Sequence, residues 1–408
     1  MNPPIELTIE KLVYGGYGLA FKGERAFFIL NALPGEIIRA EIIREKKDTS
    51  FGKTVEVVRP SPLRIEAQCP HFMHCGGCHL QHLGYPQQLQ FKRAILEETF
   101  LRIGQIKLAE VEVVPSPPWN YRTRAQFKVM KRPGNVQIGF FAAQSHRLWA
   151  IDQCPLLAGK LNESLRGIQT ERDSFSTPNV TAEEFQIRTT GDESQWAMDF
   201  VGLPPEFDFA EESPTLVPDG NLTHRTQDGN FRVGSNSFFQ VNRFLLESLV
   251  SKSIEGAAGA KALDLFSGVG LFTVPLSRKF ERVVAIEENP SSVSDLRENL
   301  RANGCANVQV LGGDVSVVLR WGPKDWEDVD FVLFDPPRQG VERRVLGQLV
   351  EHQVPECVYV SCDPTSMARD LKVLCAGGYQ IKGTRLFDFF PQTYHFETVV
   401  RLQRLLSS

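Results

Sequence analysis

The sequence has no long hydrophobic run. Its 408 residues contain no stretch of 18 consecutive apolar residues, which is about the length that a membrane-crossing helix needs. The first residues, MNPPIELTIEK, also lack the apolar segment of a secretion signal. We therefore expect a cytoplasmic protein with no membrane partner.

An excess of positive charge is also missing. Lys and Arg number 45 against 49 Asp and Glu, so the formal net charge is -4 and the chain is not basic throughout. Residues 119–148 depart from this balance, because they hold six Lys and Arg and no acidic residue. A local basic face can bind nucleic acid whatever the net charge, although the same run also fits a solvated sheet face. Its basic residues are Arg122, Arg124, Lys128, Lys131, Arg132 and Arg147.

Internal repeats and low-complexity tracts are absent, and the chain divides into three blocks. Residues 1–60 alternate apolar and polar side chains between Gly-Gly and Pro-Gly turns, which predicts a small β-barrel. Residues 61–233 predict a mixed α+β domain. Residues 234–408 alternate apolar strands with helical stretches, which predicts an α/β domain whose mostly parallel sheet is covered by helices on both faces.

The central block contains one clear helix pattern. Over about residues 85–104 the apolar residues Leu89, Leu96, Phe100 and Ile103 fall on one helical face, and Gly104 follows as a stop. This helix could pack against the domain formed by residues 234–408. Residues 121–130 and 136–143 read as strands.

Candidate ligand-binding residues follow the strands of the last block. In an open parallel sheet the ligand lies at the carboxyl ends of the strands. The first strand leads into DLFSGVG, which contains Phe266, Gly268 and Gly270 but lacks the third glycine of a dinucleotide fingerprint. Glu287 ends the second strand, where it can accept hydrogen bonds from ribose hydroxyls, and Asp314 follows the third, where it can face an adenine amino group. Acidic residues in these places suit a nucleoside with a positive sulfonium, although an NAD site or a structural glycine turn is the alternative.

The fourth and fifth strands end in reactive side chains. Asp335 precedes two prolines, a pattern that also occurs in amino-methyltransferases, and Cys362 is followed by Asp-Pro. Carbon 5 of a pyrimidine is a poor nucleophile until a thiolate adds to carbon 6, whereas an amine needs no such help. The methylated adduct then needs a base, and Glu397 offers one. Taken singly, Cys362 also fits a buried small side chain and Glu397 an edge-strand surface residue.

Four motifs together resemble those of the RNA uracil-5-methyltransferases, namely DLFSGVG, FDPPRQG, VSCDPTSMARD and PQTYHFE. The segment FRVGSNSFFQVN, residues 231–242, is similar to the one that precedes their catalytic core. The resemblance implies a class I S-adenosylmethionine methyltransferase (Rossmann-like) domain over residues 234–408 and an RNA-binding TRAM barrel over residues 1–60. It implies that Cys362 is the nucleophile and Glu397 the base. It also implies contacts to the methyl donor or target base from Gln240, Phe266, Glu287, Asp314 and Asp335. Leu271 departs from the family, since an Asn is common there, and Ser267 and Asp363 replace a frequent Cys and Asn.

Four of the eight cysteines form a separate pattern. Cys69, Cys75, Cys78 and the distant Cys154 could bind zinc or an iron-sulfur cluster, and their spacing does not separate the two. The resemblance to the 23S ribosomal RNA members of the family implies a [4Fe-4S] cluster, for which we expect a structural or RNA-positioning role.

The expected function is S-adenosylmethionine-dependent methylation of carbon 5 of a uridine in RNA. The preferred substrate is 23S ribosomal RNA, and we expect the enzyme to be a monomer. Methylation of transfer RNA is the first alternative, and a non-catalytic RNA-binding or ribosome-assembly factor is the second. The target uridine must be unstacked, so basic and aromatic side chains should contact the RNA. The candidates are Arg122, Arg124, Phe127, Lys128, Lys131 and Arg132; the alternative for the aromatic residues is a place in the core.

Overall fold

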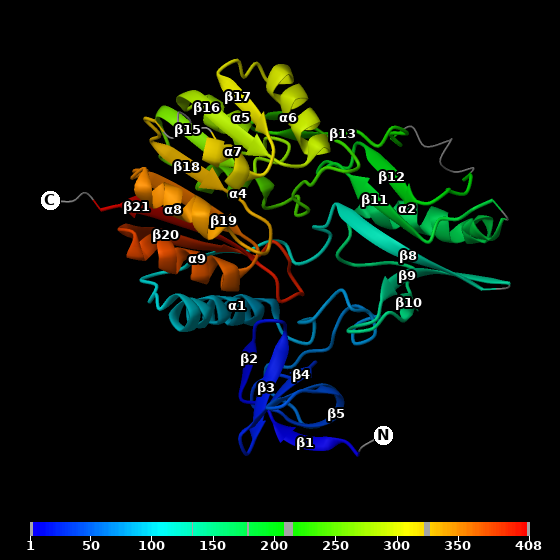
Figure 1. Ribbon diagram of the computed structural model, residues 1–408. Coiled ribbons are helices and arrows are strands. Elements are labelled where there is room, and N and C mark those ends of the chain that lie inside the picture. The colour runs from blue at the N-terminus through cyan, green and yellow to red at the C-terminus, as the bar shows by residue number, and fades with distance from the viewer. Residues whose placement is uncertain (1–2, 133, 178, 208–214, 322–326, 406–408) are drawn as a thin grey trace.

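Four β-sheets organise the protein (Figure 1). The computed structural model describes residues 3–132, 134–177, 179–207, 215–321 and 327–405. None of the described helices combines the length and apolarity needed to cross a membrane.

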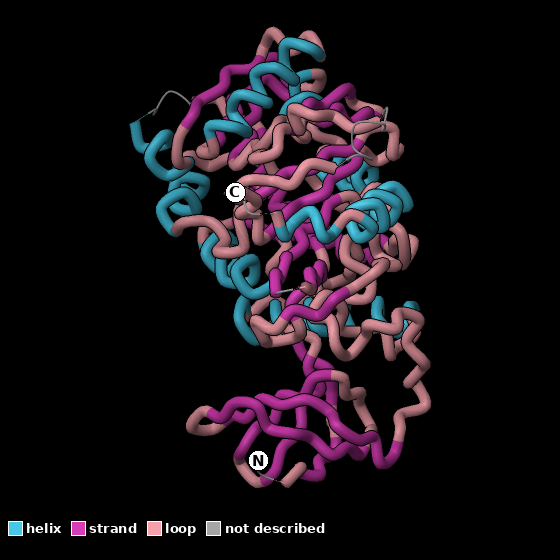
Figure 2. Tube along the Cα trace, turned by 90° about the vertical axis from the view of Figure 1, so that its right-hand side faces the viewer, coloured by secondary structure: helices cyan, strands magenta, loops and turns pink. Residues whose placement is uncertain are grey.

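The N-terminal sheet is curled into a barrel-like lobe at one end of the molecule (Figure 2). Its strand order is β1-β5-β6-β4-β3-β2. Alternate residues such as Leu7, Phe27, Ile29 and Ile38 point inward and form its small core, as the alternating sequence predicts. The strands are β1 (Ile5–Thr8), β2 (Lys11–Val13), β3 (Tyr17–Lys22), β4 (Arg25–Leu30), β5 (Ile37–Glu45) and β6 (Thr49–Arg59).

A five-stranded antiparallel sheet lies in the middle of the chain, in the order β10-β9-β8-β11-β12. Helix α2 (Gly159–Thr170) packs on it through Leu161, Leu165 and Ile168. The strands are β8 (Arg124–Arg132), β9 (Asn135–Phe141), β10 (Leu148–Ala150), β11 (Glu184–Thr189) and β12 (Trp196–Val201), and a short helical turn, Arg172–Ser176, follows α2.

The third sheet has eight strands in the order β17-β16-β15-β18-β19-β21-β20-β7. The first five are parallel, β21 runs antiparallel to β19, and β20 runs antiparallel to β21. The strands are β7 (Glu112–Val114), β15 (Gly259–Leu265), β16 (Phe280–Glu287), β17 (Val308–Gly312), β18 (Phe331–Phe334), β19 (Glu356–Ser361), β20 (Tyr379–Phe387) and β21 (Glu397–Arg404). The mostly parallel sheet predicted for residues 234–408 is therefore confirmed.

Helices cover both faces of the eight-stranded sheet. Neighbouring residues of β15 alternate between the two faces. Leu263 and Leu265 pack against one helical layer, whereas Ala262 packs against the other. Apolar side chains on both faces explain why these strands are nearly continuous hydrophobic runs. One layer holds α7 (Val315–Trp321), α8 (Arg343–Glu351) and α9 (Pro364–Ala376); the other holds α4 (Leu246–Ser253), α5 (Thr273–Ser277) and α6 (Pro290–Ala302).

The helix expected over about residues 85–104 consists of α1 (Tyr85–Thr99) and a π-helical turn, Phe100–Gly104. It lies beside α9 (Figure 1), and Leu96 and Phe100 are buried in the core of the large sheet. Ile103 is 39% exposed, contrary to the face expected for it. The wider π turn explains this difference, because it moves the following residues out of the 3.6-residue period.

Parts of the middle block also join the large sheet. Strand β7 pairs with its edge strand β20. The two-stranded sheet of β13 (Leu222–Thr226) and β14 (Gly229–Val233) packs on α6, with Phe231 and Val233 in the same core as α4 and α5. Residues 61–233 thus contribute to two cores rather than one.

Candidate active site

A cavity of about 990 Å³ opens at the carboxyl edge of the parallel strands. Eight of the nine residues expected at the donor and catalytic sites line it, and Gly270 does not. The eight are Gln240, Phe266, Gly268, Glu287, Asp314, Asp335, Cys362 and Glu397.

Strand direction explains why these residues meet. The parallel strands β15 to β19 all end at this edge, so the residues that follow them gather there. Strand β21 runs the opposite way, and therefore its first residue, Glu397, lies at the same edge. Ser361 of β19 pairs with Thr398, which places Cys362 level with Glu397.

The loop after β15 is shaped by backbone conformations that favour glycine. Phe266 adopts φ 62°, Gly268 56° and Gly270 96°, so three residues lie in the left-handed region. A Cβ on Gly270 would stand 2.6 Å from Leu296 Cδ1, whereas one on Gly268 would meet nothing within 4 Å. Gly270 therefore serves the packing of α6 against the loop, and Gly268 leaves room on the cavity side.

Glu287 is fixed by the same loop. The backbone N–H of Gly268 donates to its Oε2 at 2.9 Å, and that of Asn289 donates to its Oε1 at 2.8 Å. A carboxylate oxygen has two lone pairs, so each can accept a further hydrogen bond from a ligand hydroxyl. The geometry suits the ribose-binding role expected for this residue.

Asp264, the acid before the glycine loop, lies beneath the cavity rather than on its wall. Its side chain is buried and accepts a hydrogen bond from Thr273 Oγ1 at 2.5 Å. Burial raises its pKa to about 7. Asp314 lines the cavity, and its Oδ1 accepts from Ser316 Oγ and from the backbone N–H of Val317, which lowers its pKa.

Two buried carboxyl groups lie near the thiol of Cys362. Burial, and then the carboxylates of Glu397 and Asp335, raise the pKa of Cys362 to about 12, while Arg338 opposes them. The pKa of Glu397 is likewise raised by burial and by Asp335. A carboxyl group with a raised pKa accepts a proton readily near neutral pH, as a general base must.

Arg338 is a site residue that the sequence analysis did not single out. It follows Asp335-Pro336-Pro337 and lines the cavity, where its guanidinium lowers the pKa of Cys362 and of Glu397. The FDPPRQG motif could have pointed to Arg338, because it places a cation three residues after Asp335. Phe238 also lines the cavity and is 61% exposed.

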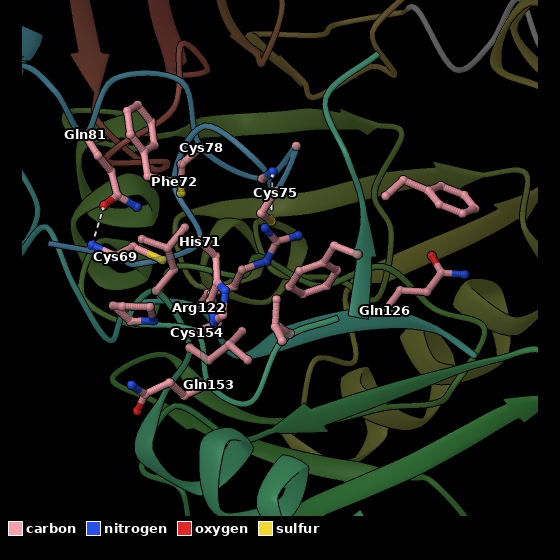
Figure 3. Close-up of a pocket in the computed structure, with 18 residues that line it drawn as sticks. Cys69, His71, Phe72, Cys75, Cys78, Gln81, Arg122, Gln126, Gln153 and Cys154 are labelled. Atoms are coloured by element: carbon pink, nitrogen blue, oxygen red, sulfur yellow. Dashed lines mark hydrogen bonds between the residues drawn. The ribbon is translucent and has the colours of Figure 1, made fainter. Parts of the chain in front are cut away.

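Figure 3 shows the four expected metal ligands on the wall of a second cavity, of about 350 Å³. Cys69, Cys75 and Cys78 come from the loop before α1, and Cys154 comes from the loop after β10. Burial raises the pKa of the Cys75 thiol to about 11, and the nearby Cys154 and Cys69 contribute. Among the described residues no three such side chains stand close enough around one point to hold a single metal ion.

Several half-buried basic residues of the segment 119–148 contact other parts of the protein. Arg122 lines the cysteine cavity, and Arg124 donates to Gln186 Oε1 and to the carbonyl of Ser237. Lys128 forms an ion pair with Glu184. Burial accounts for the lowered pKa of Arg124.

Phe127 requires a correction, because the sequence analysis offered it as an RNA contact. Its side chain has no exposed surface and stacks between Phe140 and Phe185 in the middle core. The alternation of β8 explains this, since Phe127 shares its inward face with Ala125 and Val129. Lys131 donates to the carbonyl of Val180 at 2.9 Å, and Arg132 is exposed at the strand end.

Comparisons with known proteins agree with this architecture. A family model described as Conserved hypothetical protein 95 matches residues 244–370. An uncharacterized RNA methyltransferase of Aquifex aeolicus is 34% identical over 98% of this chain and 99% of its own. The 23S rRNA (uracil(1939)-C(5))-methyltransferase RlmD of Alkalilimnicola ehrlichii is 33% identical over 98% of this chain and 97% of its own.

A solved structure matches nearly the whole fold. It is the tRNA (uracil-54, C5)-methyltransferase of Pyrococcus abyssi in complex with S-adenosyl-L-homocysteine, with a TM-score of 0.75 and 26% identity. The match covers 97% of this chain and 99% of that one. The strand order and the cavity at the strand ends define a class I methyltransferase fold, and the protein is an enzyme that methylates RNA. The chain belongs to the RNA uracil-5-methyltransferase family.

Proposed function

We propose that this enzyme methylates carbon 5 of a uridine in RNA, using Cys362 as nucleophile and Glu397 as base. One observation carries the proposal: the thiol and the carboxylate lie level on adjacent strands, on the wall of the cavity that also holds the candidate donor-binding residues. An amino-group methyltransferase would have no use for this pair.

The residues divide the reaction between them. The thiolate of Cys362 adds to carbon 6, which forms a carbon–sulfur bond and moves the electron pair of the carbon 5–carbon 6 bond toward the O4 carbonyl. S-adenosyl-L-methionine, when bound, would supply the methyl group to carbon 5; its sulfur–methyl bond would break with the electron pair on sulfur, leaving S-adenosyl-L-homocysteine. Glu397 then removes the proton from carbon 5, the double bond re-forms, and the electron pair of the carbon–sulfur bond returns to Cys362.

The other cavity residues position the two substrates. Glu287 and Asp314 hold the ribose and the adenine amino group of the donor, and Phe266 and Gln240 line the space between donor and target. Asp335 holds the target base beside Cys362. Leu271 is buried at the cavity wall, so it offers the donor an apolar contact where the family resemblance implies an Asn.

The preferred substrate is 23S ribosomal RNA, and transfer RNA is the alternative. The relative named for 23S rRNA is 33% identical, whereas the solved structure named for tRNA is 26% identical. The N-terminal lobe, as a TRAM barrel, and the exposed Arg132 with Lys131 are the proposed RNA contacts. The enzyme acts as a monomer.

The four cysteines are proposed to hold a [4Fe-4S] cluster. Their side chains line one cavity, and the resemblance to the 23S ribosomal RNA members of the family favours a cluster over zinc. A bound cluster would tie residues 69–78 to residue 154 and takes no part in methyl transfer.

The reaction is tested with RNA that carries 5-fluorouridine, incubated with S-adenosylmethionine and followed by denaturing electrophoresis. Fluorine cannot leave carbon 5 as a proton does, so the wild type should remain covalently attached to methylated RNA. Cys362→Ala should form no adduct, although it should bind RNA as the wild type does. Glu397→Gln should still form the adduct with 5-fluorouridine but should fail to release product from ordinary RNA.

Fragments of 23S ribosomal RNA and whole transfer RNA, each with 5-fluorouridine, are compared as substrates. A covalent adduct with ribosomal fragments alone supports 23S ribosomal RNA as the substrate. An adduct with transfer RNA alone would show that transfer RNA is the substrate instead. Absence of any adduct, from protein that binds both RNA and donor, contradicts the covalent mechanism.

A further inference from the structure

The N-terminal lobe reaches into the catalytic domain through the turn between β2 and β3. The hydroxyl of Tyr14 donates to Asp363 Oδ2 at 3.2 Å. Its ring packs edge-on against Tyr394, with centroids 5.3 Å apart, and against Phe396 at 6.3 Å. Tyr14 is half-buried and belongs to the core of the large sheet, although it comes from the other lobe.

These partners are the chain neighbours of the two reacting groups. Asp363 directly follows Cys362, and Phe396 directly precedes Glu397. Tyr14 therefore lies between the turn that carries the thiol and the strand start that carries the base.

The two oxygens of Asp363 divide their work. Oδ1 accepts from the backbone N–H groups of Thr365 and Ser366 and caps α9. Oδ2 accepts from Tyr14. Burial, and then the Asp363 carboxylate, raise the pKa of Tyr14, so that the phenol keeps its proton and remains a donor.

We infer that Tyr14 is a positioning residue through which the docked N-terminal lobe sets the reactivity of Cys362. Its hydroxyl holds the Asp363 turn in place and disperses the carboxylate charge next to the thiol. Without this donor, the negative charge of Asp363 favours the neutral thiol over the thiolate. As far as catalysis is concerned, the inference rests on the proposed role of Cys362.

Tyr14 can be changed without undocking the lobe, because other contacts hold it. Lys11 pairs with Glu98 of α1 at 2.6 Å. Leu12 and Leu33 of the lobe pack with Leu80 and Leu83 in a separate apolar cluster. Tyr14→Phe removes one oxygen and keeps the ring, whereas Lys11→Met removes a docking contact away from the active site and serves as the matched control.

The first measurement is the rate at which iodoacetamide alkylates Cys362 across a pH series, followed by mass analysis of its peptide. It needs neither RNA nor donor, so it remains informative if Cys362 proves not to be the nucleophile. We expect Tyr14→Phe to slow alkylation about tenfold near pH 8, because the variant loses a hydrogen bond to a charged group. The pH at which the alkylation rate rises should also shift to a higher value. Lys11→Met should alkylate within twofold of the wild type.

The second measurement separates positioning from RNA binding. Tyr14→Phe should lower kcat for methylation by about the same factor and leave KM for RNA within twofold. Unchanged alkylation, or equal losses in Tyr14→Phe and Lys11→Met, would overturn the inference. Survival of activity in Cys362→Ala would instead reject the proposed mechanism and leave the alkylation result as it stands.

A double-mutant cycle identifies the partner. Asp363→Ser keeps an N-cap for α9 but is too short to reach Tyr14. Adding Tyr14→Phe to Asp363→Ser should then change alkylation by less than twofold. Two fully additive losses would mean that Tyr14 acts on something other than Asp363.

Discussion

At the scale of single residues, the thiol of Cys362 lies near the carboxyl groups of Glu397 and Asp335, and the cation of Arg338 opposes their effect on its pKa. Burial, together with Glu397 and Asp335, raises the pKa of Cys362, and Arg338 lowers it. In the proposed mechanism, a positive methyl donor in the same cavity would act as Arg338 does and would favour the thiolate of Cys362.

Arg338→Gln should therefore slow formation of the 5-fluorouridine adduct. Loss of the cation raises the pKa of Cys362 further, so less thiolate is present at any given pH. We expect a decrease of roughly tenfold at pH 7.5, since each pKa unit corresponds to a factor of ten below the pKa. The rate should rise with pH in both proteins, because higher pH increases the thiolate fraction. Arg338→Lys, which keeps the charge, should recover part of the loss; a rate equal to that of Arg338→Gln would argue against an electrostatic role.

At the scale of elements, α1 holds the loop that leads into Glu397, the proposed base. Residues 388–396 connect β20 to Glu397, and α1 lies against them. Lys92 is buried and donates to Asp388 Oδ1 at 2.5 Å and to the carbonyls of Phe390 and His395. Gln88 adds two hydrogen bonds to Gln392, which adopts φ 68°. A helix far from β21 in sequence thus fixes the approach to Glu397.

Lys92→Met should leave the Asp388 carboxyl group without its cation in the core. Breaking a buried pair in this way costs about 3–5 kcal/mol, which urea unfolding followed by circular dichroism will measure. The double variant Lys92→Met with Asp388→Asn should recover part of the stability, because no buried charge remains. A loss below 1 kcal/mol in Lys92→Met would show that the pair is not what holds the loop.

At the scale of the whole molecule, the cysteine cavity joins two loops that share no sheet in the described part of the chain. It draws on the loop before α1 and on the loop after β10. The first loop continues into the catalytic domain, where the backbone N–H groups of His79 and Leu80 both donate to the carbonyl of Gln392 at 2.9 Å. The middle sheet, the cysteine cavity and the loop of residues 388–396 are therefore linked by a continuous series of contacts.

Cys154→Ser should remove the proposed cluster ligand that comes from the second loop. Protein purified without oxygen should contain about four irons and four sulfides per chain if the site holds a [4Fe-4S] cluster, and the variant should lose them together with the visible absorbance. Cys305→Ser, a cysteine outside the cavity, is the matched control and should keep both. About one zinc per chain and no iron would favour the alternative metal.

The sequence by itself determined the strand-end chemistry. Parallel strands bring their carboxyl ends to one edge, so acids and a cysteine placed directly after successive apolar runs had to meet there. This local rule predicted the positions of Glu287, Asp314, Asp335 and Cys362 before any contact was known. The spacing of the four cysteines also predicted that they lie together, and all four line one cavity.

Tertiary structure decided what depends on packing between segments far apart in the chain. Whether Phe127 faced RNA or the core could not be read from an alternating strand, because alternation gives two faces without saying which one is covered. The π turn that exposes Ile103, the burial of Lys92 and the inward use of Arg124 all follow from neighbours that are distant in sequence. The contact between Tyr14 and Asp363 spans 349 positions, so only the docking of one lobe on the other could reveal it.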